Sequence, residues 1–232
     1  MPGLRGGAKE DRRRWTNDGV LPDLPAVVAA VYTFCMLKCA ITSGEGWAVM
    51  EHVRRWSHEG VDYVQLREKQ MAAGELVKLA VAMLVVLRES GSTKLLVNGR
   101  PDVAVAAGAD GVHLTAQEGE LTVAQVREVF EAAGAGTPVI SVSCHTLEEV
   151  RRAGADGADF ILFGPVFEKR VAGEVVVEGV GIGVLREACA AAGGAKVLAL
   201  GGVHAGNAPD CVRVGAAGVA AIRMFQAAGD PE

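Results

Sequence analysis

Short runs of apolar residues alternate with longer amphipathic stretches along most of the chain. From Met36 onward the runs are rich in Val, Ile and Leu, and polar or glycine-rich turns separate them from stretches with helical periodicity. Runs that are apolar throughout are typical of parallel strands covered on both faces. The predicted strands are Leu37–Thr42, Tyr63–Arg67, Lys94–Asn98, Gly111–Leu114, Pro138–Val142, Phe160–Phe163, Lys196–Leu200 and Gly218–Ile222.

The stretches between these runs predict helices. They include Trp47–Ser57, Ala73–Glu89, Val123–Ala133 and Leu147–Ala155. Thr122 and Thr146 are expected to cap the last two, and Glu149 completes a capping box with Thr146. Spacing in the first helix places Trp47 on the same side as Val53. Glycines in the phrases at 108–111, 154–156 and 215–218 are expected to end helices in a left-handed turn.

Strand and helix alternate eight times within residues 36–232, and no interior linker suggests a second domain. The pattern predicts an α/β protein with a single (β/α)₈ TIM barrel. A doubly wound open sheet is the alternative, because the number of strands does not prove closure. Residues 1–35 are expected to form an N-terminal extension outside the fold, and Met36, directly before the first strand, is the expected translation start.

Composition narrows the class of partner. The net charge of −5 argues against nucleic acid, although Arg12–Arg14 form a local basic cluster. Five cysteines without a CxxC pair indicate reduced thiols in a cytoplasmic protein. The apolar stretch 26–37 is shorter than the roughly 20 residues that span a bilayer, so no membrane partner is expected.

Polar side chains follow the second strand at its carboxyl end, where barrels of this class place their active sites. Alternation along Gln65-Leu66-Arg67-Glu68-Lys69 points Gln65, Arg67 and Lys69 to one side. Cations in a barrel mouth need a partner, so Arg67 and Lys69 predict an anion site occupied by a phosphate, with Glu68 as the other possible partner.

Glycines follow the seventh strand as Gly201-Gly202. Backbone N–H groups after the last two strands form the usual phosphate cradle of such barrels, and glycine permits close approach of the phosphate. These two residues therefore predict phosphate contact. His113 lies in the middle of a strand, which favours a structural role for its imidazole.

The strand-end phrases together resemble the thiamine phosphate synthase/TenI family over about residues 37–226. The markers are QLREK (65–69), VNGRPDVA (97–104), GADGVHL (108–114), SVSCHTLEEV (141–150), ADFILFGPVF (158–167) and LALGGV (198–203). The resemblance implies an enzyme of thiamine biosynthesis whose partner is a small phosphorylated thiazole substrate. It leaves a homo-oligomer open, and also whether the loop 167–180 closes over the site.

Family members of the synthase branch join a pyrimidine diphosphate to a thiazole phosphate. They typically hold Mg²⁺ with an Asn-Asp pair after the third strand and an Asp after the VHL strand. Here Gly99 follows Asn98, and Gly119 stands at the second position, next to Glu118 and Glu120. The synthase Thr-x-Thr-Lys stretch is absent from 168–173. The resemblance therefore implies no metal and no cofactor, with Mg²⁺ needed only if the chain is a synthase.

Asn-Gly-Arg after the third strand is similar to the TenI branch, which includes thiazole tautomerases that isomerise a carboxythiazole phosphate without metal. The family's catalytic histidine maps onto His145, whose imidazole suits proton transfer near neutral pH. We expect a tautomerase with His145 as acid and base. The expected substrate-binding residues are Gln65, Arg67, Lys69, Asn98, Gly201 and Gly202. A synthase using Glu118 or Glu120, and a non-catalytic relative, are the alternatives.

Overall fold

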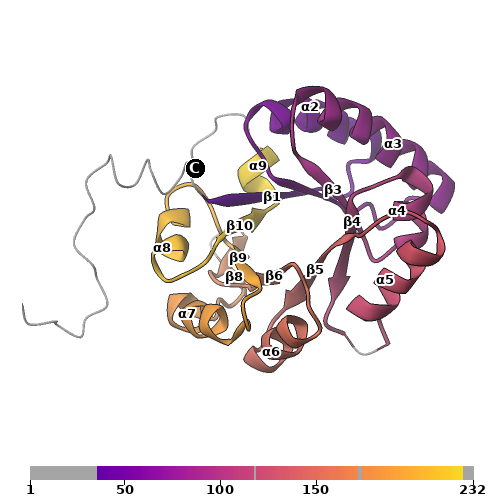
Figure 1. The fold of residues 1–232 in the computed structure, drawn as a ribbon. Helices are drawn as coiled ribbons and strands as arrows, with labels where there is room; N and C mark the ends of the chain where they lie inside the picture. The colour runs from indigo at the N-terminus through magenta and orange to yellow at the C-terminus, as the bar shows by residue number, and fades with distance from the viewer. Residues whose placement is uncertain (1–35, 118, 172–173, 227–232) are drawn as a thin grey trace, which may run out of the picture.

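Eight parallel strands close into a barrel in the computed structural model, which describes residues 36–117, 119–171 and 174–226 (Figure 1). Around the ring the strands are β1 (Leu37–Ile41), β10 (Gly218–Ala221), β9 (Lys196–Leu200), β6 (Phe160–Phe163), β5 (Val139–Cys144), β4 (Gly111–Thr115), β3 (Lys94–Asn98) and β2 (Tyr63–Leu66). The ring closes where β1 pairs with β10, with Leu37 opposite Gly218. The predicted barrel is confirmed, and the open sheet is wrong.

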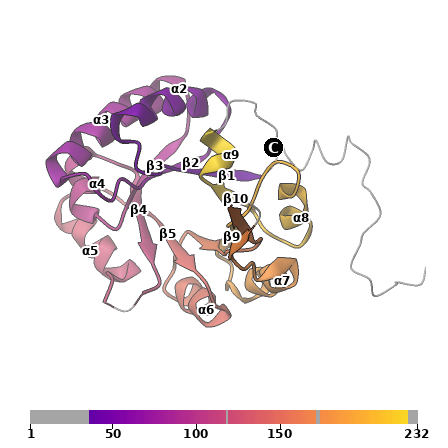
Figure 2. The same cartoon turned by 180° about the vertical axis from the view of Figure 1, so that it is seen from behind.

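Helices form a layer outside the strands in both views (Figures 1 and 2). They are η1 (Gly46–Val49), α2 (Met50–His58), α3 (Ala73–Ser90), α4 (Pro101–Ala107), α5 (Val123–Ala132), α6 (Leu147–Ala155), α7 (Gly181–Ala191), α8 (Ala208–Arg213) and α9 (Arg223–Gln226). The short α9 lies in this layer between α8 and α2 (Figures 1 and 2). None of the described helices is long and apolar enough to cross a membrane. The predicted extension 1–35 and its arginine cluster lie outside the described residues.

The predicted caps are present. The hydroxyls of Thr122 and Thr146 accept hydrogen bonds from the backbone N–H groups three residues later, and both helices have complete capping boxes. Trp47 is a correction: it is 48% exposed in the 3₁₀ turn η1, and α2 buries Val53 and Trp56 instead. Gly154 is a second correction, because it does not end a helix in a left-handed turn. It lies inside α6, where an added Cβ would be 2.3 Å from the Ala192 carbonyl oxygen.

Side chains that point into the barrel divide its interior into two chemically different halves. An apolar cluster lies mainly on β1, β6, β9 and β10, where it includes Ile41, Phe160, Leu162, Leu198 and Ala220, and it extends to Leu96 of β3. On β2 to β5, polar residues take the inward positions in the middle and at the carboxyl ends of the strands, and these positions form the polar half. These residues are Gln65, Asn98, His113, Thr115, Ser141 and Ser143. The inner apolar cluster supports the fold, and the polar half supplies the candidate site.

A small antiparallel hairpin, β7 (Lys169–Val171) with β8 (Glu174–Val177), projects from the connection between β6 and α7. The sequence analysis treats this segment only as a loop. Val175 and Val177 are each 41% exposed and Val176 is 52% exposed, so the run Glu174–Val177 is not a strand of the buried barrel.

Gly111 begins β4 where that strand lies closest to β5, and an added Cβ would be 1.8 Å from the Val139 carbonyl oxygen. We expect Gly111→Ala to lower the free energy of unfolding by at least about 3 kcal/mol, because a carbonyl in a strand ladder cannot move aside. Urea denaturation measures this change.

The matched control is Gly183→Ala, in α7, where an added Cβ meets no atom within 4 Å. This change should raise stability by up to about 1 kcal/mol, because alanine favours the helix over glycine. Equal effects of the two substitutions would contradict the close β4–β5 approach.

Candidate active site

Gln65 and Asn98 lie side by side at the carboxyl ends of β2 and β3. The Gln65 Nε2 donates a hydrogen bond of 2.8 Å to Asn98 Oδ1. Gln65 is only 3% exposed, and its Oε1 is buried without a hydrogen-bond partner among the described residues. Buried acceptors are normally satisfied, so an unpartnered amide oxygen at a strand end indicates a place where a ligand donates.

Arg67 and Lys69 line a pocket of about 370 Å³ above the ends of β1 and β2, together with Ser43, Gly44, Gly46, Glu68, Gln70 and Met71. Within the described part of the chain, neither cation forms an ion pair or a side-chain hydrogen bond. Arg67 is half-buried and Lys69 is exposed. Two neighbouring cations without an internal counter-charge favour an anionic ligand.

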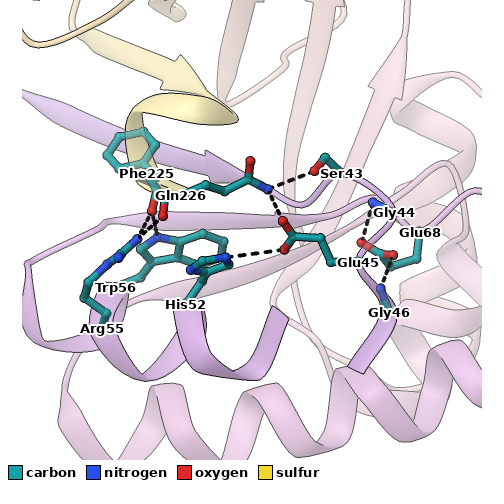
Figure 3. A network of polar contacts seen from close by, with 10 residues as sticks. All are labelled: Ser43, Gly44, Glu45, Gly46, His52, Arg55, Trp56, Glu68, Phe225 and Gln226. Atoms are coloured by element: carbon teal, nitrogen blue, oxygen red, sulfur yellow. Dashed lines mark hydrogen bonds and ion pairs between the residues drawn. The ribbon is translucent and has the colours of Figure 1, made fainter. Parts of the chain in front are cut away.

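Glu68 is one of the two partners expected for Arg67 and Lys69, but its carboxylate binds backbone N–H groups instead. Its carboxylate is 6% exposed and accepts hydrogen bonds from the backbone N–H groups of Gly44, at 3.1 Å, and Gly46, at 2.8 Å (Figure 3). Alternation along the chain sends Glu68 outward to the loop after β1, away from the side of Arg67. Glu68 therefore holds the pocket wall and leaves the positive charges of Arg67 and Lys69 uncompensated.

The same loop is tied to the last helix. Gln226 Nε2 donates to Ser43 Oγ at 2.8 Å and to Glu45 Oε1 at 2.7 Å, as Figure 3 shows. The indole Nε1 of Trp56 donates to the Phe225 carbonyl at 2.6 Å. These contacts join residues more than 160 positions apart and fix the loop from its outer side.

His113 lies in the polar half of the barrel between two serines. Its Nδ1 is 2.7 Å from Ser141 Oγ, and its Nε2 is 2.8 Å from Ser143 Oγ. Burial, reinforced by the positive charge of Arg67, lowers the pKa of His113 to about 3, so the ring is neutral near pH 7. The ring is only 3% exposed, and the two serines give it a defined orientation.

His145 follows β5 on the rim of the barrel. Its Nδ1 donates to the Gly164 carbonyl oxygen at 2.5 Å, and its backbone N–H donates to Glu149 Oε2 at 2.5 Å. Because a carbonyl only accepts, Nδ1 carries the proton in this contact and Nε2 has the free lone pair. The exposed imidazole is therefore held in the tautomer that accepts a proton at Nε2.

Cys144, directly before His145, does not compete for a chemical role. Burial raises the pKa of its thiol to about 12, with the Glu149 charge adding to the effect. A thiol with so high a pKa stays protonated near pH 7 and is a poor nucleophile.

Gly201 and Gly202 follow β9 with positive φ angles of 90° and 63°. An added Cβ would lie 2.5 Å from Cα of Pro165 and 2.7 Å from Cβ of Phe167. The glycines are thus required by the close approach of the loop after β6. Their predicted contact with phosphate stays a prediction, because packing alone explains both residues.

The predicted site residues fall into two groups. Gln65 and Asn98 touch each other, and Arg67 and Lys69 line one pocket on the β1–β2 side. The second group surrounds the 164–167 segment, which contacts His145 on one side and the Gly201–Gly202 turn on the other. The pocket beside Arg67 includes no residue of the second group.

Comparison with known proteins identifies the family. A family model described as thiamine monophosphate synthase matches residues 39–225. The chain belongs to the thiamine monophosphate synthase family. The match covers the whole barrel from the first strand to α9, and it confirms the coarser part of the resemblance seen in the sequence.

Relatives within the family carry synthase names. A putative thiamine-phosphate synthase of Geobacter sulfurreducens is 45% identical over 175 residues, covering 74% of this chain and 76% of its own. A thiamine-phosphate synthase of Methanoculleus marisnigri is 35% identical over 192 residues, covering 82% and 85%. A solved thiamine phosphate pyrophosphorylase from Pyrococcus furiosus matches with a TM-score of 0.69 at 26% identity, covering 83% of this chain and 89% of its own. These names favour the synthase alternative over the TenI branch.

The described carboxylates near the mouth do not form a magnesium site held by the protein. No group of three His, Cys, Asp or Glu side chains among the described residues is placed to bind a metal ion. Asp102, near Asn98, is paired with Arg100, whose Nε donates to it at 2.8 Å. Glu120 is exposed, and Glu118 lies outside the described residues.

Two groups of residues in this site were not predicted from the sequence. The hydrogen bonds from Gly44 and Gly46 to Glu68 join residues 24 and 22 positions apart, respectively, and no local sequence pattern indicates them. The serines of Ser141-Val142-Ser143 do have a signal, because they alternate on the inward face of a strand that is otherwise apolar. That alternation places both hydroxyls beside His113.

Glu68→Gln tests the loop anchor. Glutamine offers one acceptor oxygen and turns an N–H group toward one of the two backbone donors. We expect the free energy of unfolding to fall by about 1–3 kcal/mol, as when a buried donor loses its partner, and KM for the anionic substrate to rise as the pocket wall loosens.

Glu75→Gln is the matched control, because Glu75 is an exposed residue whose surface partner is Lys78. It should change stability and KM little. Unfolding curves and steady-state kinetics measure both quantities, and a Glu68→Gln protein with unchanged values would contradict the anchor.

Proposed function

We propose that this chain is a thiamine-phosphate synthase, which joins a pyrimidine diphosphate to a thiazole phosphate and releases pyrophosphate. The observation that carries the proposal is the pair Arg67 and Lys69, which share a pocket and lack an ion-pair partner among the described residues. The synthase names of relatives whose matches cover 74% to 82% of the chain support it.

In this reaction the bond between the pyrimidine methylene carbon and the diphosphate oxygen breaks, and a bond from that carbon to the thiazole nitrogen forms. Negative charge grows on the departing diphosphate. Arg67 and Lys69 are placed to stabilise that charge, and a guanidinium can bind two phosphate oxygens at once. Gln65 and Asn98 would orient the substrate through the free Oε1 of Gln65 and the Asn98 amide.

In the proposed reaction, Mg²⁺ would arrive bound to the substrate, because the described carboxylates do not form a site that holds the ion. Mg²⁺ commonly binds substrate phosphates and keeps several waters, so a diphosphate could carry its own ion into the pocket.

A second candidate function, thiazole tautomerase, is favoured by one specific observation. The His145 imidazole holds its proton on Nδ1 toward Gly164 and presents a free Nε2. A group of this kind can take a proton from one ring position and return it to another. Gly99, where the synthase branch usually has Asp, agrees with this second candidate.

Paired assays on one preparation decide between the two functions. We expect pyrophosphate release from the pyrimidine diphosphate in the presence of Mg²⁺, and no isomerisation of the carboxythiazole phosphate. Isomerisation that persists in EDTA, without pyrophosphate release, would replace the synthase by the tautomerase. Binding of thiazole phosphate without turnover in either assay would indicate a non-catalytic relative.

Lys69→Gln tests the anion site within the synthase reaction. We expect kcat/KM to fall at least about tenfold, the usual effect of losing one charge-assisted contact to phosphate. Lys94→Gln is the matched control, because Lys94 is an exposed lysine at the amino end of β3, on the opposite face of the barrel. If both substitutions have the same effect, the pocket is not the diphosphate site.

His145→Gln separates the two candidates by residue. A tautomerase that uses His145 as its proton carrier should lose about 100-fold or more in kcat. The synthase proposed here should lose much less, because His145 lies outside the cationic pocket. His58→Gln, at an exposed histidine of α2, controls for the loss of an imidazole.

A further inference from the structure

Ser141, His113 and Ser143 form a chain of two hydrogen bonds. Which atom donates each bond follows from the number of acceptors available to the Ser141 hydroxyl. Ser141 is 1% exposed, and the only hydrogen-bond partner of its hydroxyl among the described residues is Nδ1 of His113. A buried hydroxyl left without an acceptor for its hydrogen is unfavourable by about 1–3 kcal/mol. Ser141 therefore donates its hydrogen to Nδ1, and Nδ1 is the unprotonated nitrogen of the ring.

The rest of the chain follows from that first bond. A neutral imidazole with a bare Nδ1 carries its proton on Nε2. The ring is neutral because burial and the nearby Arg67 charge disfavour a second proton. Nε2–H then donates to Ser143 Oγ at 2.8 Å, which occupies a lone pair of that oxygen and leaves the Ser143 hydrogen free.

We propose that Ser141 and His113 are positioning residues, which fix the Ser143 hydroxyl as a hydrogen-bond donor to an oxyanion in the barrel mouth. Ser143 is half-buried, inward-facing and one residue before the end of β5. In the opposite arrangement its oxygen would face the mouth only as an acceptor, and would suit an N–H group instead. The hydroxyl direction therefore selects the chemical class of the ligand.

Two further observations point to an acceptor at this place. Thr115 lies opposite Ser143 in the β4–β5 register, and its Oγ1 is buried without a partner among the described residues. Arg67 lies close enough for its charge to act on His113 and has no ion pair in the described part of the chain. A donating Ser143 hydroxyl, the neighbouring Thr115 hydroxyl and the Arg67 charge would together suit a phosphate or diphosphate oxygen.

The tautomer is measured directly, without ligand, on the full chain labelled with ¹⁵N-histidine. Long-range ¹H–¹⁵N spectra at pH 7 should show His113 with a protonated Nε2 and a bare Nδ1. His113→Gln assigns the signals, and Ser141→Ala should convert the ring to a mixture of tautomers. A parent protein with a protonated Nδ1, or with a mixture, overturns the proposal.

A double-mutant cycle tests whether Ser141 acts through Ser143. Inorganic pyrophosphate is the probe, and its affinity is measured by calorimetry. We expect Ser143→Ala to weaken binding about tenfold and Ser141→Ala about threefold, as for a hydrogen bond to a charged group and its support. In the Ser143→Ala background, Ser141→Ala should have less than about a twofold effect. Independent, multiplying effects overturn the relay.

Thr93→Val is the matched control for a lost buried hydroxyl. Thr93 Oγ1 donates to the Val61 carbonyl at 2.6 Å, at the amino end of the barrel. This variant should lose stability without any change in pyrophosphate affinity, and a weakened affinity would show that Ser141→Ala acts through stability alone. The measurement of pyrophosphate affinity rests on the proposed function. A parent that binds no pyrophosphate would count against the synthase, whereas the tautomer spectra would still decide the relay.

Discussion

Successive side chains of a strand must point to opposite faces, and in a closed barrel this rule decides which residues can meet. One set of alternating positions lines the interior, and the other packs under the helices. In this chain the inner set is mainly apolar on β6, β9, β10 and β1, whereas on β2 to β5 it is apolar near the amino ends, as at Leu96, and polar toward the carboxyl ends. The apolar residues fill the barrel, and the polar residues lie at the end that carries the candidate site.

The same rule separates Glu68 from its neighbours. Arg67 and Glu68 are adjacent in the sequence, yet opposite directions of their side chains send the carboxylate to the glycine loop and leave the guanidinium near the mouth. A negative charge bound by two backbone N–H groups is satisfied without neutralising a cation. The pocket therefore keeps a positive field inside a chain whose net charge is −5.

Much of the fold could be predicted because its signals are local. Lys94–Asn98, Phe160–Phe163 and Lys196–Leu200 match the observed strands, since strands buried on both faces have a continuous apolar run in their middle. Thr146 and Glu149 form their cap within four residues. The apolar run of β8 is misleading by the same criterion, because Val175, Val176 and Val177 are exposed.

The site could be predicted as a set of residues but not as an arrangement. Strand-end position identifies Gln65, Arg67 and Lys69, but it does not show that Gln65 binds Asn98 of the next strand or that the intervening Glu68 is held by the loop after β1. The contact of His145 with Gly164 joins two strands across 19 positions, and the direction of the His113 proton depends on what surrounds Ser141. The contact and the proton position depend on which donors and acceptors surround each group in three dimensions, and residue spacing along one strand does not show this.

The tie between the first loop and the last helix has a consequence for synthesis on the ribosome. The loop after β1 is translated early, but Gln226, whose amide holds Ser43 and Glu45 of that loop, is translated nearly two hundred residues later. A nascent chain that has emerged only as far as β9 lacks both the strand that closes the ring and the helix that fastens the pocket wall. The pocket beside Arg67 and Lys69 is therefore complete only after the last strand and helix of the described chain have been synthesised.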